Sequence, residues 1–289
     1  MKVAIITPYH QESADILWRC HASVRAQTYP ATHFMVSDGF PNAAAAKWDV
    51  QHLRLPAAHA DGGDTPRGLG ALSALNQGYD AVGFLDADNW LADDHVESCL
   101  ATCARQKAPI ALASRQIVLS SGQYCAFEDR DVVERRHVDT SCFFMLREAA
   151  AMMAVWAMID PRVWQACDRI MLSAIRARGL GHAWTGHKSV YYNSHWGLHF
   201  LAMGLPPPAD EHQIDWDAVA ARYDAPALVS RLGFDPDLDF SNNDHAAADD
   251  GAALSFLSRV VMSGRPIIAS ARQAPPTRVD GGEKRSAVG

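Results

Sequence analysis

The first half of the chain alternates short apolar runs with amphipathic segments of helical length. Runs rich in Val, Ile, Phe and Leu predict strands, and the segments between them predict helices. The predicted strands are 2–7, 33–37, 52–55, 81–85 and 110–114, and the predicted helices are 15–27, 69–79 and 92–106. Strands that alternate with helices form βαβ units and a mostly parallel sheet. Such a sheet binds ligands at the carboxyl ends of its strands.

The second half of the chain is less regular. It predicts a strand at 142–146, a helix at 161–178 and a short strand at 189–192. Three prolines at 206–208 mark a boundary, beyond which helices are predicted at 215–224 and 252–262. The last residues are rich in Pro, Gly and charge and predict disorder. We therefore expect a domain over 1–206, a helical C-terminal extension over 207–270 and a disordered tail over 271–289.

Composition excludes several classes of protein. The 289 residues are 48% hydrophobic, which is enough for a sizeable core. A net charge of −7 provides no basic field for nucleic acid. No apolar run approaches the roughly 18 residues of a transmembrane helix, and the start resembles a first strand ended by Pro8 rather than a signal peptide. Six cysteines without a Cys-x-x-Cys pair favour a reducing compartment. We expect a cytoplasmic protein, with peripheral attachment to the inner membrane face left open.

The sharpest local feature is Phe84-Leu85-Asp86-Ala87-Asp88-Asn89, where an apolar strand leads directly into two carboxylates. Mg²⁺ or Mn²⁺ is bound by one or two carboxylates together with phosphate oxygens and water. Alternatively, these acids cap the helix that follows near Ala92. Their position after a buried strand favours the metal.

Two further segments combine turn residues with charge. Asp38 ends an apolar run before Gly39, where its carboxylate can accept hydrogen bonds from a base or a ribose, or simply form a turn. A glycine-rich segment from Gly62 to Gly70 carries Arg67, and it either cradles a phosphate or is a flexible loop. No Gly-Lys-Ser/Thr follows, so it is not a Walker A loop.

Asp168 and a group of histidines complete the candidates. Asp168 lies in the middle of a predicted helix, as either a salt-bridged surface residue or a general base. His195 and His199 have the i, i+4 spacing that places two imidazoles on one helix face, and His187 precedes them. The chain has no His-Glu-x-x-His, which excludes a zinc-protease site of that type.

Together these segments resemble the family 2 glycosyltransferases, which have the GT-A fold. The resemblance covers residues 1 to about 206. It rests on Val3-Ala-Ile-Ile-Thr-Pro8-Tyr9, Ser23-Val-Arg-Ala-Gln-Thr-Tyr29-Pro30, Ser37-Asp38-Gly39, Arg67-Gly-Leu-Gly70 and the segment from Phe84 to Asn89. The chain departs from the family pattern at Ser37, which replaces an Asp, and at Pro66 and Gly68, which flank Arg67. It also departs at Cys167, which replaces the acid before the base.

The resemblance implies a mostly parallel GT-A-type sheet flanked by helices. It implies inverting transfer of a sugar from a UDP- or GDP-type donor to an unknown hydroxyl acceptor, with Mn²⁺ or Mg²⁺ as cofactor. The residues it implies in donor binding are Pro8, Tyr9, Asp38, Arg67, Asp86 and Asp139. Asp86 would contact ribose or metal, Asp88 would bind the metal, and His195 or His199 would complete the metal site. Asp168 would be the general base, with Asp139 as its competitor.

Two other functions stay open. A nucleotidyltransferase has a related sheet, but its glycine-rich loop usually follows the first strand directly, where this chain has Thr7-Pro8-Tyr9-His10. A non-catalytic nucleotide-sugar-binding protein would not need Asp86, Asp88 and Asp168. For the enzyme, we expect Asp38, Arg67 and Asp86 to converge on one pocket at the carboxyl edge of the sheet.

Overall fold

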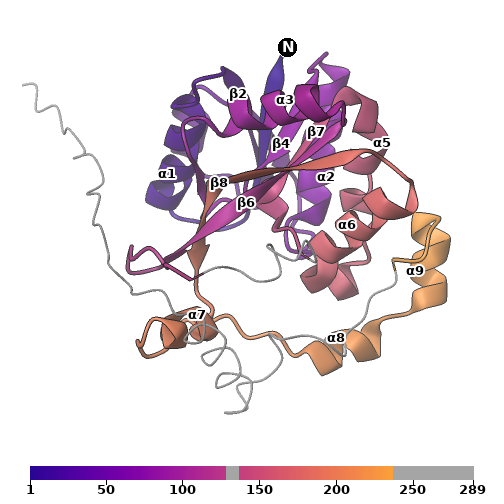
Figure 1. The fold of residues 1–289 in the computed structure, drawn as a ribbon. Coiled ribbons are helices and arrows are strands. Elements are labelled where there is room, and N and C mark those ends of the chain that lie inside the picture. The colour runs from indigo at the N-terminus through magenta and orange to yellow at the C-terminus, as the bar shows by residue number, and fades with distance from the viewer. Residues whose placement is uncertain (128–136, 237–289) are drawn as a thin grey trace, which may run out of the picture.

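Figure 1 shows a computed structural model of the protein, which describes residues 1–127 and 137–236. At its centre lies an eight-stranded sheet of order β3-β2-β1-β4-β7-β6-β8-β5. Its strands are β1 Val3–Tyr9, β2 Ala31–Asp38, β3 Gln51–Leu55, β4 Ala81–Phe84, β5 Trp90–Leu91, β6 Ile110–Leu119, β7 Phe143–Leu146 and β8 His182–Ser194. The neighbours β3, β2, β1 and β4 run parallel, as do β6 and β8. β7 runs antiparallel to β4 and β6, and β5 antiparallel to β8. The predicted α/β fold with a mostly parallel sheet is confirmed.

Helices flank the sheet (Figure 1). The α-helices are α1 Ala14–Arg25, α2 Asp64–Asn76, α3 His95–Gln106, α5 Ala150–Met153, α6 Cys167–Ala177, α7 Gly197–Ala202, α8 Trp216–Arg222 and α9 Ala225–Leu232. Short 3₁₀ helices are η1 Ala45–Lys47, η2 Thr140–Cys142, η3 Arg147–Ala149, η4 Trp156–Met158 and η5 Pro161–Ala166.

Strand β1 is buried along its whole length because helices cover both faces of the sheet. Adjacent side chains of a strand point to opposite faces. Ile6 faces α2, where a side chain on Gly70 would meet it, and Thr7 faces α1, where its hydroxyl lies 3.6 Å from the Cys20 sulfur. The carboxyl end of β1 therefore emerges between two helical layers.

Several predicted boundaries were wrong. Helix α2 begins at Asp64 rather than at 69, because the Asp61 side chain accepts a hydrogen bond from the Thr65 N–H and caps the helix start. Arg67 therefore lies in a helix and not in a flexible loop. The helix predicted at 161–178 is broken into η5 and α6, and Val163 has non-helical angles.

The strand predicted at 189–192 also has wrong bounds, since it extends over 182–194 as β8. Strand β6 likewise continues five residues beyond the predicted range. Both strands are long because they pair with each other over most of their length. Neither extension is visible as a continuous apolar run, since polar side chains interrupt both sequences.

The C-terminal part that the structure describes packs on the main core. Helix α8 fits the helix predicted at 215–224, whereas α9 was not predicted. Trp216 and Leu228 belong to the principal hydrophobic cluster, and the Arg169 guanidinium lies 5.2 Å from the Trp216 ring centre. The helix predicted at 252–262 and the tail at 271–289 lie outside the described residues.

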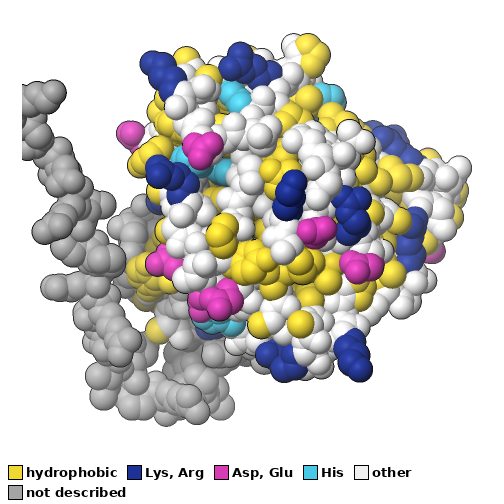
Figure 2. All heavy atoms as spheres, turned by 90° about the horizontal axis from the view of Figure 1, so that it is seen from above, with side chains coloured by type: hydrophobic (Ala, Val, Ile, Leu, Met, Phe, Trp, Pro, Cys, Tyr) yellow, Lys and Arg dark blue, Asp and Glu magenta, His cyan; other side chains and the backbone are white. Residues whose placement is uncertain are grey.

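Two further observations concern the charge on the surface and the hydropathy of the helices. On the face that Figure 2 shows, Lys and Arg side chains are scattered among acidic and apolar ones, without a continuous basic stripe over the described residues. Within the same residues, no helix is both long and apolar enough to cross a membrane.

The close contact between α2 and the sheet gives a stability prediction. A methyl group on Gly70 would lie 2.6 Å from Ile6 Cγ2 and 2.8 Å from Val36 Cγ2, both in buried strands. Gly70→Ala should therefore lower the free energy of unfolding by about 1–2 kcal/mol, since overpacking outweighs the gain in helix propensity. Chemical denaturation measures this value. Gly181→Ala is the control, because its new methyl group makes only an ordinary 3.4 Å contact; an equal loss in both variants would contradict the explanation.

Candidate active site

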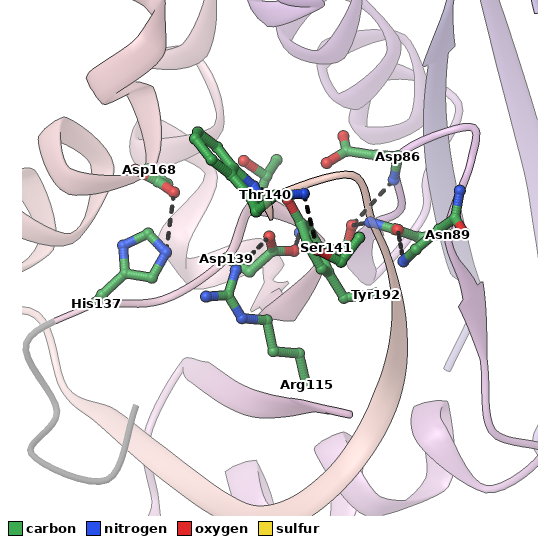
Figure 3. Close-up of polar contacts among 12 residues, drawn as sticks. Asp86, Asn89, Arg115, His137, Asp139, Thr140, Ser141, Asp168 and Tyr192 are labelled. Atoms are coloured by element: carbon green, nitrogen blue, oxygen red, sulfur yellow. Dashed lines mark hydrogen bonds and ion pairs between the residues drawn. The ribbon is translucent and has the colours of Figure 1, made fainter. Parts of the chain in front are cut away.

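The predicted acids gather at one edge of the sheet because of its topology. Asp38 ends β2, and Asp86 follows β4 two residues after its last strand residue. Asp139 immediately precedes η2 and β7, and because β7 is antiparallel to β4, its start lies beside the carboxyl end of β4. Asp168 lies in the first turn of α6. Figure 3 shows Asp86, Asp139 and Asp168 around a common space.

Asp86 is held through both its side chain and its backbone. Its carboxylate Oδ1 accepts a hydrogen bond from Arg67 Nη2 at 2.8 Å, and its backbone N–H donates to Ser141 Oγ at 3.1 Å. Ser141 Oγ also accepts from Asn89 Nδ2 at 3.1 Å. Ser141, in the segment before β7, thus holds the turn that carries Asp86 and Asp88 by two hydrogen bonds.

Asp88 has no comparable partner. Arg19 contacts its backbone carbonyl at 2.7 Å, and the described residues contain no ion pair to its carboxylate within 4 Å. Burial, and then the nearby charge of Asp86, raise the pKa of Asp88 to about 7. A half-buried acid beside a like charge is a place where a cation lowers the electrostatic energy.

These two acids fit a divalent ion that completes its shell with ligand oxygens. No group of three His, Cys, Asp or Glu side chains within residues 1–127 and 137–236 is arranged to hold a metal by itself. Mg²⁺ is commonly bound by one or two carboxylates plus substrate phosphates rather than by an all-protein cage. Asp86 and Asp88 match that pattern.

Asp139 is part of a buried ion pair. Its Oδ2 lies 3.3 Å from Arg115 Nη1, and its Oδ1 accepts the Ser141 N–H at 3.0 Å. The Arg115 guanidinium lies 4.7 Å from the centre of the Tyr192 ring (Figure 3). Burial raises the pKa of Asp139 to about 6, against the lowering effect of Arg115.

Asp168 is not the salt-bridged surface acid that the sequence left open. Its side chain is 17% exposed, and its Oδ2 lies 3.4 Å from His137 Nε2 (Figure 3). Burial raises the pKa of Asp168 to about 6, although Arg169 lowers it. The carboxylate is therefore ionised at neutral pH while retaining substantial basicity.

The donor-side candidates Asp38 and Tyr9 have partners within the protein. Both Asp38 oxygens accept the His59 N–H, and His59 Nδ1 lies 2.6 Å from Oδ1. Tyr9 is buried, its hydroxyl bonded to His52 Nε2 at 2.7 Å and to the Asn42 N–H. A pocket lined by loops 10–12 and 39–42 lies beside Asp38.

Of the three residues expected in one pocket, Arg67 and Asp86 are in contact. Asp38 lies at the same edge of the sheet, separated from β4 by β1. Pro8, the other predicted donor contact, packs against Gly63 just before α2. Donor binding stays a prediction for Pro8, Tyr9, Asp38, Arg67 and Asp139.

The expectation that His195 and His199 lie on one helix face was wrong. His195 follows the end of β8 in a loop, and His199 lies in the short helix α7, so the i, i+4 spacing spans two different conformations. His195 Nδ1 pairs with Asp210 at 2.9 Å, whereas His199 is buried with its Nδ1 2.6 Å from Ser194 Oγ. The predicted metal-binding pair is thus replaced by two separate environments.

Sequence reasoning missed several residues of the site. Arg115 lies just past the predicted end of its strand, and His137, Ser141 and His59 carry no motif. Asp64, which bonds to Arg67 at 2.8 Å, was taken as part of a glycine-rich loop. The order Asp61-Gly-Gly-Asp64 before an apolar helix is a capping signal that would have moved the helix start.

Residues 4–147 match the profile of Glycosyl transferase family 2. This part of the chain belongs to that family. No curated protein matches the sequence.

Solved structures of S. aureus TarS share the fold. TarS 1–349 in complex with UDP has a TM-score of 0.54 and 13% identity, over 90% of this chain and 71% of that one. TarS 1–349 in complex with UDP-GlcNAc has a TM-score of 0.50 and 11% identity, over 90% and 72%. A longer TarS chain has a TM-score of 0.53 and 12% identity, and the match covers 90% of this chain but 43% of that one. At identities this low, the structural matches show a common fold alone.

The buried Arg115–Asp139 pair gives a prediction for stability. Arg115→Met should lower the free energy of unfolding by about 3–5 kcal/mol at pH 8, because it leaves a buried carboxylate without its cation. The loss should be smaller at pH 5. Without Arg115 the pKa of Asp139 rises further above 6, so the acid is protonated and uncharged there.

Chemical denaturation at both pH values measures these changes. The double variant Arg115→Met/Asp139→Asn should recover much of the stability, since both charges are gone. Arg105→Met, at an exposed position of α3, should change stability by about 0.5 kcal/mol or less. A pH-independent loss in Arg115→Met would contradict the electrostatic explanation.

Proposed function

We propose that this family 2 protein is an inverting glycosyltransferase that moves a sugar from a UDP- or GDP-type nucleoside diphosphate sugar to a hydroxyl acceptor. The observation that carries the proposal is the arrangement at the carboxyl edge: Asp86 and Asp88 form an acidic pair, and Asp168 faces the same space. The TarS complexes with UDP and UDP-GlcNAc support a nucleotide-sugar donor, since the fold is shared.

Asp86 and Asp88 are the residues that would hold Mn²⁺ or Mg²⁺. When bound, the ion offsets the charge that develops on the departing diphosphate. Asp88 serves in its ionised form, which binding of a cation favours by lowering its raised pKa. Arg67 fixes one oxygen of Asp86 and thereby orients its carboxylate. A role for His195 or His199 as a further ligand stays a prediction.

Asp168 is the proposed general base. It takes the proton from the acceptor hydroxyl as the oxygen attacks the anomeric carbon from the side opposite the diphosphate, which inverts that carbon. His137, 3.4 Å away, limits the directions in which the carboxylate can turn. Asp139 is less suited, because it pairs with the buried guanidinium of Arg115, whereas Asp168 accepts the Arg169 N–H and lies near His137.

Asp38 is the proposed contact for the nucleotide base, beside the pocket that residues 10–12 and 39–42 line. Its oxygens now accept hydrogen bonds from His59. Displacement of the His59 side chain, which is 37% exposed, would release the contact of its Nδ1 with Oδ1, while the backbone N–H of His59 would still bond to the carboxylate.

The first functional prediction concerns the metal. Mn²⁺ should strengthen binding of UDP or GDP to the wild type, and a chelator should remove the gain. Asp88→Ala should weaken Mn²⁺-dependent binding at least about tenfold, equivalent to about 1.4 kcal/mol. Asp93→Ala, at an exposed position before α3, should stay within about twofold. Isothermal titration calorimetry gives these affinities; unchanged affinity in the presence of chelator would contradict metal-assisted binding.

The second functional prediction concerns Asp168. Asp168→Asn should keep the fold and donor affinity, while release of nucleoside diphosphate from the bound sugar donor falls about a hundredfold or more. In the wild type the rate should fall as pH drops below about 6, because Asp168 becomes protonated there. Asp160→Asn is the control, since this acid pairs with the exposed Arg162 on the same segment.

Near-normal turnover of Asp168→Asn would instead assign the base to Asp139. Donor binding without turnover in the wild type, with acceptor extracts supplied, would favour a non-catalytic binding protein. Release of inorganic pyrophosphate from a nucleoside triphosphate would favour a nucleotidyltransferase.

A further inference from the structure

Asp64 is a buried carboxylate that the proposed mechanism does not use. It lies in the first turn of α2 with 1% of its side chain exposed. Its Oδ1 accepts a hydrogen bond from Arg67 Nη1 at 2.8 Å, while Oδ2 has no hydrogen-bond partner among the described residues. Burying an incompletely bonded carboxylate costs stability, so its presence here needs a reason beyond packing.

Arg67 divides its guanidinium between two acids. Nη1 donates to Asp64 Oδ1 and Nη2 donates to Asp86 Oδ1, both at 2.8 Å. A guanidinium can instead place two parallel hydrogen bonds on both oxygens of one carboxylate. Here Asp86 receives one such bond, and within the described part of the chain no residue bonds to its Oδ2.

We propose that Asp64 is a positioning residue for the cation site. Asp64 accepts a hydrogen bond from Arg67 Nη1 and thereby prevents the guanidinium from bonding to both oxygens of Asp86. One oxygen of Asp86 therefore stays available for the divalent ion. The inference rests on the proposed function, in which Asp86 and Asp88 bind that ion.

Few acceptors surround the Arg67 guanidinium, and besides the two acids the Gly62 carbonyl lies 3.5 Å from Nη2. The side chain is 2% exposed and lies 5.0 Å from the centre of the Trp156 ring. Among the described residues, Asp64 and Asp86 are the carboxylates within 4 Å of it. Loss of the Asp64 acceptor therefore leaves Nη1 buried without a partner, and Asp86 offers the nearest anionic oxygen.

Asp61 provides a matched control. It is buried to the same degree, 2% exposed, and it also supports the start of α2 through the Thr65 N–H at 3.0 Å. In the described structure it makes no hydrogen bond or ion pair with Arg67. Asp61→Ala therefore disturbs the same helix start without releasing the guanidinium.

The experiment compares the affinity of the full-length protein for UDP and for GDP with and without Mn²⁺, by calorimetry. For each nucleotide, the affinity with Mn²⁺ divided by the affinity without Mn²⁺ is the Mn²⁺ enhancement. Asp64→Ala should lower this enhancement about tenfold, while affinity without metal changes little. Asp64→Asn should keep it within about threefold, because the amide oxygen still accepts from Arg67. Asp61→Ala should keep it within about twofold, even where its melting temperature falls.

A second pair of variants tests the route through Arg67 and does not depend on whether Asp64→Ala folds. Arg67→Gln removes the guanidinium through which Asp64 is proposed to act. In that background, replacing Asp64 should no longer change the Mn²⁺ enhancement. Arg67→Gln and Arg67→Gln/Asp64→Ala should therefore have the same Mn²⁺ enhancement. A further loss in the double variant would overturn the proposal, because Asp64 would then act on the cation site without Arg67.

The remaining outcomes separate the two levels of inference. Equal enhancement in wild type and Asp64→Ala overturns the role of Asp64 and leaves the proposed function intact. An equal loss in Asp61→Ala and Asp64→Ala overturns it too, since any damage to the helix start would then suffice. A wild type without Mn²⁺ enhancement for either nucleotide overturns metal-assisted donor binding itself, and the role of Asp64 with it.

Discussion

Crowding of like charges at the end of β4 is the interaction on which the rest of the site depends. Asp86, Asp88, Asp139 and Asp168 approach one another there, and burial disfavours the charged forms of Asp88, Asp139 and Asp168 and raises their pKa values. Two buried arginines partly compensate. Arg67 pairs with Asp86, and Arg115 pairs with Asp139. Asp88 and Asp168 have no arginine within ion-pair distance among the described residues. The negative charge without an arginine partner therefore lies on Asp88 and Asp168, the residues proposed to bind the cation and to accept the proton.

The antiparallel strand β7 makes this crowding possible. In an all-parallel sheet, the segment before a strand lies at the opposite edge from the segment after its neighbour. Because β7 runs against β4, the residues before it reach the carboxyl end of β4. Ser141 then bonds to both the Asp86 N–H and the Asn89 side chain, and Asp139, two residues earlier in the chain, lies at the same edge. One reversed strand thus adds a second set of side chains to an edge that βαβ units alone would have left to loops.

The parts of this arrangement that sequence predicted are those with a local cause. Strands β1, β2 and β4 are apolar runs, and the position of Asp86 and Asp88 follows from the end of β4. The start of α2 was missed because Gly62 and Gly63 suggested a loop, while the cap from Asp61 acts at side-chain level. Arg115 and His137 could not be predicted, because their places depend on pairing between distant strands and on contacts across the sheet edge. His195 and His199 show the opposite error: a helical spacing was read in a segment where a strand ends and a new helix begins.

The choice between the two candidate bases follows from what each carboxylate would lose by taking a proton. Asp139 and Asp168 both have a pKa raised to about 6, so basicity alone does not separate them. Protonating Asp139 would cancel its attraction to Arg115 and leave a buried guanidinium without its counter-charge, which is costly in an apolar environment. Protonating Asp168 leaves no buried arginine without its ion-pair partner, since its carboxylate accepts the backbone N–H of Arg169 at 2.7 Å and lies 3.4 Å from His137 Nε2. The acid that can change charge without disrupting a buried pair is Asp168, and this asymmetry favours it as the group that accepts a proton in each turnover.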